Sequence, residues 1–273
     1  MSARAKRRHL LFSIFIVVIP CLVLLVALYK VSFFTVHRRY AYAKIKISQG
    51  LWWASTEKPS AWMLDSIQAG DKSYDLFGNL QAEVLSVRSY PAPQQISYPV
   101  DNYDIYVEAK LAVTYDRRKH LYYFDRNVLS IGSPIEIQTG RSDINGTVIE
   151  LSDKELQDLY VDKTVILTKR MAYSWEYNAI PIGDSYFDGV NQVFQVLEKS
   201  QTPTSQIVQD MYGNLLSGTV TSTSYITIKA RIKVLDKNGQ FYFGEERLLT
   251  AGNPIDLTTA HYNYKDFVVA SIY

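Results

Sequence analysis

The chain has 273 residues, an ordinary globular composition and a formal net charge of +2. With 47% hydrophobic and 21% charged residues, it is not a fully disordered, collagenous or polytopic membrane protein. A single cysteine excludes a disulfide framework, a cysteine-ligated zinc site and an iron–sulfur cluster. Residues 1–39 hold seven basic and no acidic side chains, whereas the rest of the chain holds 22 basic and 27 acidic ones. An acidic body without a basic stripe argues against nucleic-acid binding.

The first predicted element is a membrane segment. Leu10–Tyr29 is a run of twenty uncharged, almost wholly apolar residues. At ~1.5 Å per residue, such a helix spans the ~30 Å hydrocarbon core of a bilayer. A cleaved signal peptide is the rival interpretation, but the run exceeds the usual ~7–15 apolar residues and no small-residue cleavage site follows it. We therefore expect an uncleaved signal anchor at residues 10–34, in which Cys21 is a small apolar filler.

The orientation of this segment rests on its flanks. Basic residues precede and follow the span, so the positive-inside count is nearly a tie. A short tail with four positive charges is hard to translocate, whereas a domain behind a signal anchor is routinely exported. We expect residues 1–9 to be a cytoplasmic tail and the body to lie outside the cytoplasm, on the cell membrane.

Two pairs of segments in the body resemble each other. Residues 61–71 align with 174–184 at an offset of 113, and residues 121–139 align with 241–259 at an offset of 120. The identical pairs include Trp62/Trp175, Ile67/Ile180, Gly70/Gly183, Asp71/Asp184, Tyr122/Tyr242, Leu129/Leu249, Gly132/Gly252, Pro134/Pro254, Ile135/Ile255 and Thr139/Thr259. These positions occur in the same order in both copies, which indicates an internal repeat.

The repeat predicts two tandem homologous units, at residues 40–151 and 161–273. Each is long enough for an independent core. Residues 152–160 join them, and Ser152 ahead of an acidic turn predicts a short helical linker. Because the linker is short, we expect the two units to pack side by side.

In chain order, the units are predicted to open on strands at Tyr40–Ile47 and Lys163–Lys169. A short helix is expected at Pro59–Ile67, with the proline in its first turn. Alternating apolar and polar residues predict further strands with one buried and one wet face. These strands are Asn79–Arg88, Asp104–Thr114 and Ser224–Val234.

Turn residues separate the predicted strands. Gly70-Asp71, Gly183-Asp184, Gly132-Ser133-Pro134 and Gly252-Asn253-Pro254 are expected to turn into strands, and residues 116–119 and 236–239 to form hairpin loops. The predicted fold class is mainly β: a transmembrane helix followed by two small barrel or sandwich units. We expect six or seven short strands in each unit and one short helix that plugs an open end. Trp62 and Trp175, in these helices, are assigned to the two cores.

Short motifs recur along the body. They are Ile67–Asp71, Ile131–Pro134 and Gly146–Ile149 in the first copy, and Ile180–Asp184 and Gly252–Pro254 in the second. This arrangement resembles a family of uncharacterised bacterial single-pass membrane proteins, although Asp266–Val269 replaces the closing Gly-Thr-Val in the second copy. The resemblance implies an N-terminal anchor and a small, mostly β extracytoplasmic domain, here in two copies. It implies no activity, so no catalytic residue is carried over.

The repeated carboxylate pairs are the first candidates for chemistry. Asp71 with Asp75, and Asp184 with Asp188, have the oxygen ligands that Ca²⁺ prefers. The favoured interpretation is structural, because an Asp after Gly caps a turn by accepting bonds from nearby backbone N–H groups. The loop at 236–239 resembles the start of an EF-hand but lacks its third acidic position and closing Glu, so it is expected to be a hairpin turn.

The remaining candidates also favour structural interpretations. His120 and His261 are expected to be exposed, and Asn145-Gly146-Thr147 to turn into the last strand of its unit rather than accept a glycan. The 21 tyrosines are assigned to sheet packing, with a binding face for peptide or glycan as the alternative. Trp52 and Trp53 are placed at the membrane interface or between the units. No catalytic, cofactor-binding or metal-binding residue is predicted.

The leading functional hypothesis is a non-enzymatic, membrane-anchored extracytoplasmic β protein that serves as an envelope interaction or scaffold module. Its expected partners are the lipid bilayer, through residues 10–34, and other envelope proteins; homo-oligomers are left open. One alternative is an accessory subunit of a trans-envelope export or pilus-type machine. The other is a carboxylate-dependent hydrolase, in which Asp71 and Asp75 would line a cleft and have raised pKa values.

Overall fold

The computed structural model describes residues 20, 25, 39–47, 59–92, 102–209, 212 and 215–273, without the side chains of 205–211 and 213–222. Within this part of the chain no helix is long and apolar enough to cross a membrane. The predicted span at 10–34 lies outside the described residues except for two of its positions, so the anchor stays a prediction. Cys21, Trp52 and Trp53 also lie outside them.

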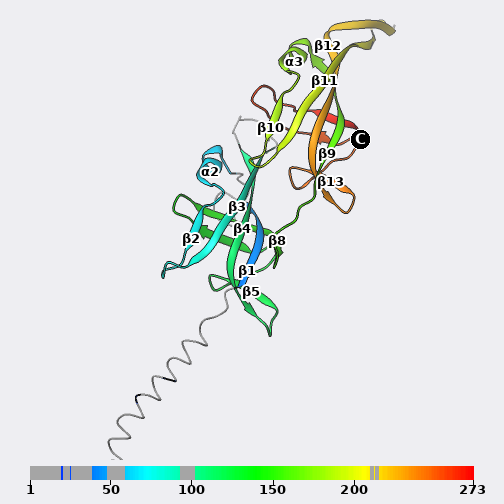
Figure 1. Cartoon of the computed structure of the whole chain (residues 1–273). Helices are drawn as coiled ribbons and strands as arrows, with labels where there is room; N and C mark the ends of the chain where they lie inside the picture. The colour runs from blue at the N-terminus through cyan, green and yellow to red at the C-terminus, as the bar shows by residue number, and fades with distance from the viewer. Residues whose placement is uncertain are drawn as a thin grey trace, which may run out of the picture.

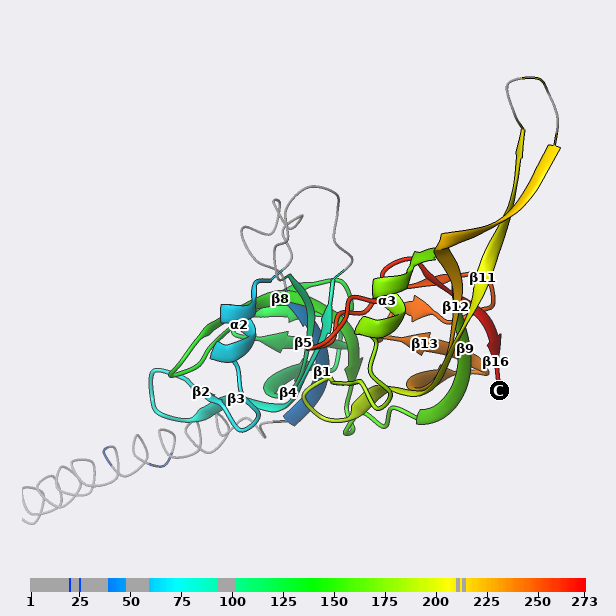
Figure 2. The same cartoon turned by 90° about the horizontal axis from the view of Figure 1, so that it is seen from above.

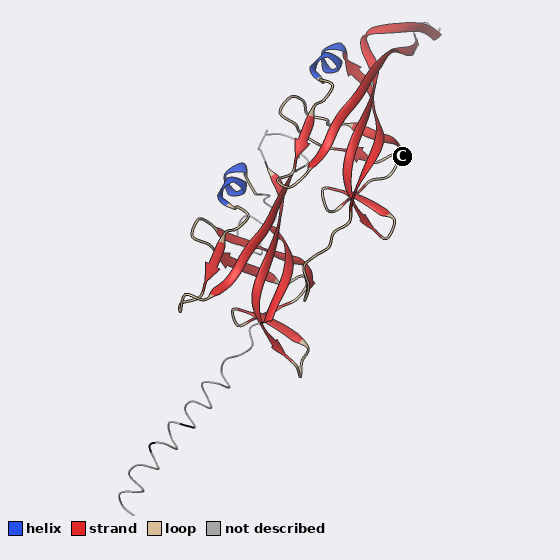
Figure 3. Cartoon of the chain, viewed as in Figure 1, coloured by secondary structure: helices blue, strands red, loops and turns tan. Residues whose placement is uncertain are grey.

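The described chain is mainly β and forms two open, half-barrel sheets of eight strands each (Figures 1 and 3). The first contains β1 (Arg39–Ile47), β2 (Lys72–Tyr74), β3 (Leu80–Pro91), β4 (Tyr103–Asp116), β5 (Leu121–Phe124), β6 (Asn127–Leu129), β7 (Pro134–Gln138) and β8 (Asp143–Ser152). The second contains β9 (Tyr160–Tyr173), β10 (Ser185–Phe187), β11 (Gln192–Gln209), β12 (Leu215–Lys237), β13 (Gln240–Phe243), β14 (Arg247–Leu248), β15 (Pro254–Ile255) and β16 (Phe267–Ile272). The helices are α2 (Ala61–Ser66) and α3 (Ser174–Ala179).

The two sheets have the same strand order. The first runs β2-β3-β4-β1-β8-β7, with β5 on β4 and β6 on β5; the second runs β10-β11-β12-β9-β16-β15, with β13 on β12 and β14 on β13. The helices also occupy equivalent places, each between the opening strand and the first edge strand. The predicted strands and the short helix at 59–67 are confirmed. Pro134 and Pro254 open the equivalent strands β7 and β15, as their alignment predicts.

Alternating apolar residues build the two cores. In β1, Ala41, Ala43 and Ile45 are fully buried, and in β12 the same holds for Ile226 and Ile228. Neighbouring antiparallel strands bring these side chains onto one concave face, where burial removes them from water. Each sheet therefore has its own group of buried apolar residues.

Four predictions about the units are wrong. Each sheet has eight strands rather than six or seven, and it is an open half-barrel rather than a closed barrel or a sandwich. The helices do not plug the cores: no α2 residue is buried, and Glu176 is the only buried residue of α3. Trp62 is 61% exposed and Trp175 is 64% exposed. The side chains that enter the cores here are Ile67 and Ile180, which directly follow the helices.

The predicted helical linker is also wrong. Residues 153–159 contain no helix, and the Ser152 hydroxyl accepts only a local bond from the Lys154 N–H at 3.0 Å. The linker is extended because its far end is held by both sheets: Asp158 contacts Lys44, and the carbonyl of Leu159 accepts the N–H of Asp236 at 2.8 Å. A helix would shorten the segment and move Asp158 and Leu159 away from their partners.

Strands β11 and β12 continue beyond the rest of their sheet as a two-stranded arm, which projects from the body in Figures 1 and 2. On one side β10 pairs with β11 only as far as Gln195, and on the other β9 pairs with β12 only from Thr223 onward. Thr204–Gln209 pairs with Leu215–Val220 and with no other described strand. The register shifts at Pro203/Thr204, and such a bulge bends and twists a ribbon.

Candidate functional site: a buried polar interface

The end of β3 packs against the second sheet, and the side chain of Tyr90 lies in the core of that sheet. Tyr90 and Tyr106, which belong to the first sheet, are each 2% exposed and lie within the core of the second. The ring of Tyr90 meets the ring of Phe243 edge-on, with centroids 5.9 Å apart. Gly244 lies so close that an added Cβ would be 3.3 Å from Cγ of Tyr90. The end of β3 therefore packs against the second sheet, whereas the division of the body into two homologous units stays a prediction.

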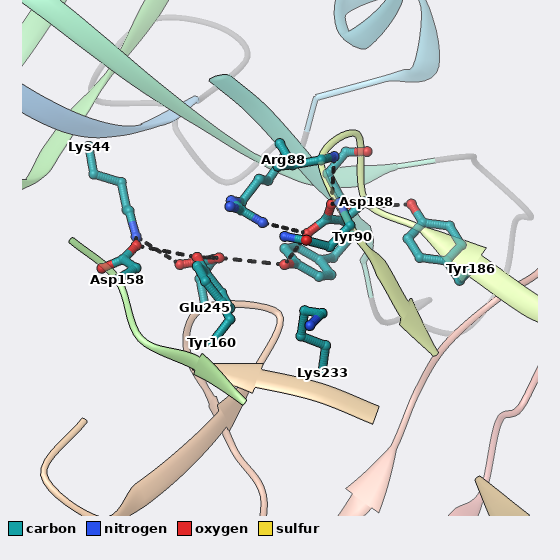
Figure 4. Close-up of polar contacts among 12 residues, drawn as sticks. Lys44, Arg88, Tyr90, Asp158, Tyr160, Tyr186, Asp188, Lys233 and Glu245 are labelled. Carbon is teal, nitrogen blue, oxygen red and sulfur yellow. Dashed lines mark hydrogen bonds and ion pairs between the residues drawn. The ribbon is translucent and has the colours of Figure 1, made fainter. Parts of the chain in front are cut away.

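Asp188 forms one half of this interface, on the turn between β10 and β11 (Figure 4). Its Oδ1 accepts the N–H groups of Val190 and Asn191, each at 2.7 Å, and so fixes the turn. Its Oδ2 accepts Nη1 of Arg88 at 3.0 Å and the hydroxyl of Tyr90 at 2.9 Å. Because Asp188 is fully buried, this carboxylate depends on its partners for compensation of its lost hydration.

The backbone of the same turn also forms a hydrogen bond with β3. The N–H of Ser89 donates to the carbonyl of Asp188 at 2.7 Å, and Tyr186 donates its hydroxyl to the carbonyl of Ser89 at 3.1 Å. Gly189 makes this approach feasible, since it has φ +110° and an added Cβ would lie 2.4 Å from the carbonyl oxygen of Val87. Any side chain at this position would push the two sheets apart.

Glu245 forms the other half, in the tight turn between β13 and β14. It adopts a left-handed φ of 71° and is 3% exposed. Its carboxylate accepts Nζ of Lys44 at 2.9 Å and the hydroxyl of Tyr160 at 2.5 Å. Lys44 also contacts Asp158, so one cation from β1 is shared by two carboxylates from the second half of the chain (Figure 4).

The pKa shifts in this cluster come from burial and from neighbouring charges. Burial, Glu245 and Asp188 raise the pKa of Tyr90 far above its ordinary value, and burial with Glu245 does the same for Tyr160. Burial lowers the pKa of Lys44, but Glu245 and Asp158 outweigh it, and the pKa is raised. The guanidinium of Arg88 lies 4.3 Å over the ring of Tyr160. The tyrosines are therefore neutral donors and the lysine a fixed cation at neutral pH.

This arrangement stabilises the junction between the sheets. Each of its carboxylates accepts hydrogen bonds from at least two side chains, and the tyrosine shifts oppose deprotonation near neutral pH. A general base needs a carboxylate or imidazole that is free to take a proton from a substrate. These groups instead form a clamp, which we call the buried polar interface and define by Lys44, Arg88, Tyr90, Asp158, Tyr160, Asp188 and Glu245.

An open groove of about 650 Å³ lies beside this interface, between α2, β3 and the β10–β11 turn. Its apolar lining includes Leu64, Ile67, Val87, Phe187 and Val190. Asp188 is the ionisable residue on its wall, and that carboxylate is already committed to the interface. The groove supplies apolar surface but no available charged group among its lining residues.

The predicted carboxylate pairs are turn caps in the first copy. Asp71 accepts the N–H of Gln68 at 2.8 Å, and Asp75 accepts those of Phe77 and Asn79 at 2.9 Å each. No group of three or more side chains suited to a metal ion is present among the described residues.

The second predicted pair, Asp184 and Asp188, lies in the second sheet and has different partners. Asp184 is 4% exposed and accepts the hydroxyls of Thr259 at 2.7 Å and Tyr264 at 2.6 Å. Asp188 caps its turn and in addition holds Arg88. The capping interpretation is confirmed for Asp71, Asp75 and Asp188, whereas the side chain of Asp184 bonds the C-terminal part of its sheet instead.

The loop at 236–239 is a hairpin turn, as predicted, in which Asp236 accepts the N–H of Gly239 at 2.8 Å. His120 and His261 are exposed, also as predicted. The expected turn at residues 145–147 is wrong, because they lie inside β8. Gly146 permits β1 to approach there, since an added Cβ would lie 2.6 Å from the carbonyl oxygen of Lys46.

Sequence reasoning missed most of the buried polar interface. Lys44 lies in a strand whose alternation is ordinary, and Arg88 and Tyr90 end another. The alignment of the repeat gave one indication of the site. Glu245 aligns with Asp125, and Asp188 aligns with Asp75. Two buried acids of the interface therefore correspond to turn acids in the first half of the body. No periodicity distinguishes the exposed member of each pair from the buried one.

No protein-family model, no curated protein and no solved structure matches this chain. The resemblance suggested by the turn motifs therefore stays a prediction.

Proposed function

We propose that this chain is a non-enzymatic, membrane-anchored extracytoplasmic β protein that serves as an interaction or scaffold module of the cell envelope. In this proposal residues 10–34 hold the body at the membrane, and two homologous units arisen by duplication form one body. The shared strand order of the two sheets supports the duplication. The charge-free run at 10–29 supports the anchor.

The observation that carries an interaction role is the β11–β12 arm. Residues 201–224 contain a single charged residue, Asp210, although charged residues make up 21% of the chain. Where the arm leaves the sheet, the outer edges of its two strands pair with no other described strand. Proteins usually protect such edges with charges, proline or a covering segment, because an open edge pairs readily with another chain. Pro203 lies at the base of the arm, and residues 204–220 beyond it contain no proline. An extended, uncharged ribbon is suited to binding a partner by strand addition.

The buried polar interface supports the same role. Two half-barrels joined by a flexible linker would present the arm in many orientations. Here Arg88 and Lys44 hold the second half of the chain to the first through buried carboxylates, so the arm has one direction relative to the body. A fixed direction lowers the entropy that is lost when a partner binds.

Photo-crosslinking in whole cells tests the arm. A photoreactive residue replaces Thr202, which is exposed near the base of the arm, and in a matched variant it replaces the exposed linker residue Asp153. We expect discrete crosslinked products from position 202 and none from position 153. Equal products from both positions, or none from the arm, would contradict the proposal. Several envelope proteins recovered in fixed ratio would instead favour the accessory-subunit role.

Proteolysis of intact spheroplasts tests the anchor and its orientation. We expect the chain to fractionate with membranes and residues 40–273 to be digested without lysis. A body that stays protected until lysis would contradict the extracytoplasmic location, and a chain recovered in the soluble fraction would contradict the anchor.

A further inference from the structure

The turn between β4 and β5 carries an exposed run of cations. Arg117, Arg118 and Lys119 are all exposed. Asp116 orders the turn, because its Oδ1 accepts the N–H of Arg118 at 2.8 Å and that of Lys119 at 3.2 Å. The only acid in the turn is therefore engaged with its backbone, while the three cationic side chains extend into solvent.

The N-terminus of β1 lies at the same end of the sheet. Arg39, the first residue of β1, pairs with Val113, just before the turn. Its guanidinium lies 5.1 Å from the centroid of the Tyr115 ring, and the hydroxyl of Tyr115 bonds Nδ1 of His120 at 3.0 Å. The chain thus enters the sheet beside the basic turn, and Arg39 adds a fourth cation to it. Figure 1 shows the beginning of β1 and the β5 hairpin together at one end of the molecule.

The equivalent turn of the second sheet shows that these cations are not needed for the hairpin. There Asn238 and Gly239 have φ of 57° and 83°, the left-handed values that these residue types adopt most readily. In the first sheet the left-handed position of the turn is His120, with φ 54°. The first turn therefore has three cations where the second has Lys237 alone, together with less favourable turn chemistry. Residues that are less favourable for the turn than those of the equivalent hairpin point to a functional use.

We propose that the basic end of the first sheet, defined by Arg39, Arg117, Arg118 and Lys119, binds the anionic phospholipid headgroups of the bilayer that holds the anchor. This inference rests on the anchor of the proposed function. Arg39 lies five positions after residue 34, the end of the predicted span, so at ~3.5 Å per position it lies within roughly 18 Å of the span. Charges attract an anionic surface only within about a Debye length, ~8 Å at physiological salt, so the basic end must face the headgroups closely.

Headgroup binding would do more than add affinity to an anchored chain. A single anchor leaves the body free to tilt about its exit point. Contact by a cluster on one end would hold the first sheet against the membrane and direct the second sheet, with its arm, away from it. The buried polar interface carries that orientation from one half of the molecule to the other.

The test uses the full chain in lipid nanodiscs, with Cys21→Ser and a bimane label on Thr114→Cys, an exposed position beside the basic turn that removes none of its cations. Nitroxide-labelled headgroups quench the dye on contact. We expect at least twofold stronger quenching in phosphatidylglycerol than in phosphatidylcholine nanodiscs. The difference should vanish at 1 M salt and in the triple variant Arg117→Gln, Arg118→Gln, Lys119→Gln. A label on Gln240→Cys, beside the equivalent turn of the second sheet, should show no lipid dependence.

In the quenching experiment, the inference is overturned by equal quenching at position 114 in both lipids or by no quenching in either. A chain that does not enter nanodiscs contradicts the anchor instead. The full chain is then sedimented with vesicles of each lipid, and pelleting only with phosphatidylglycerol still supports the basic end, whereas no pelleting overturns it. The charge-matched triple variant Arg170→Gln, Lys237→Gln, Lys265→Gln removes exposed cations elsewhere and should bind as the wild type does.

Discussion

Single glycines set the turns that begin each sheet's first edge strand. Gly70 has φ +90° and Gly183 has φ +88°, a region that L side chains rarely adopt. An added Cβ would meet nothing within 4 Å at either position, so the requirement for glycine comes from the backbone alone. Both glycines donate their N–H across the turn, Gly70 to the carbonyl of Val84 at 2.8 Å.

Replacement of Gly70 by alanine should therefore cost about 1 kcal/mol of unfolding free energy, from left-handed strain. Gly140→Ala is the matched control, because Gly140 also has open space around it but does not have a left-handed φ. We expect that change to be neutral or slightly stabilising, since alanine restricts the unfolded chain. Urea unfolding of both variants measures the difference. Equal costs at the two positions would contradict the backbone explanation.

Among the elements, the turn after β2 and the equivalent turn after β10 differ in how deeply they are buried. The turn after β2 is capped by a partly exposed Asp75, and the neighbouring Leu76 and Phe77 are 101% and 90% exposed. The turn after β10 is capped by Asp188, fully buried because it docks on the edge of β3. The same local structure is thus a hairpin with exposed Leu76 and Phe77 in the first sheet, and the central contact between sheets in the second.

Asp188→Ala should cost about 3–5 kcal/mol, because it leaves the buried guanidinium of Arg88 without its carboxylate and the hydroxyl of Tyr90 with only a long bond of 3.4 Å to Glu245. Asp75→Ala removes the equivalent turn cap of the first sheet, which accepts the N–H groups of Phe77 and Asn79, and it should cost about 1 kcal/mol. Chemical denaturation compares the two variants. If Asp75→Ala is as damaging as Asp188→Ala, the buried pair is not what stabilises the junction.

For the whole molecule, the interface makes the free energy of unfolding decrease as the pH rises into the alkaline range. The folded pKa values of Tyr90, Tyr160 and Lys44 are raised, whereas in the unfolded chain tyrosine titrates near ~10 and lysine near ~10.4. Below those values both states hold the same protons, and the stabilisation is fully present. Above pH ~10 the unfolded state releases protons that the folded state retains, so stability is lost as the pH rises.

We expect the unfolding free energy to be flat between pH 7 and 9 and to fall above pH ~10. Tyr160→Phe should reduce that alkaline slope by about 1 kcal/mol per pH unit. Tyr74→Phe, at an exposed tyrosine outside the interface, should leave the slope unchanged. Urea titrations at a series of pH values measure both. A slope that Tyr160→Phe does not alter would show that the interface is not its source.

Local patterns along the chain were enough to predict turns and strands of both sheets. Left-handed glycines at 70 and 183, prolines that open β7 and β15, and alternating strands such as Asp104–Thr114 act over a few residues, so their signals are readable along the chain. The order of these signals also indicated two copies. The same reasoning failed for Trp62 and Trp175, because amphipathicity in a six-residue helix does not say which neighbour fills the core.

How the two sheets meet depends on contacts between residues far apart in the sequence. Lys44, Arg88 and Glu245 are up to 201 residues apart, and each has an ordinary local context. Whether a turn acid such as Asp75 or Asp188 is solvated or buried depends on what another part of the chain places over it. Pairing of buried charges is set by distances in three dimensions, and no period along the sequence encodes them.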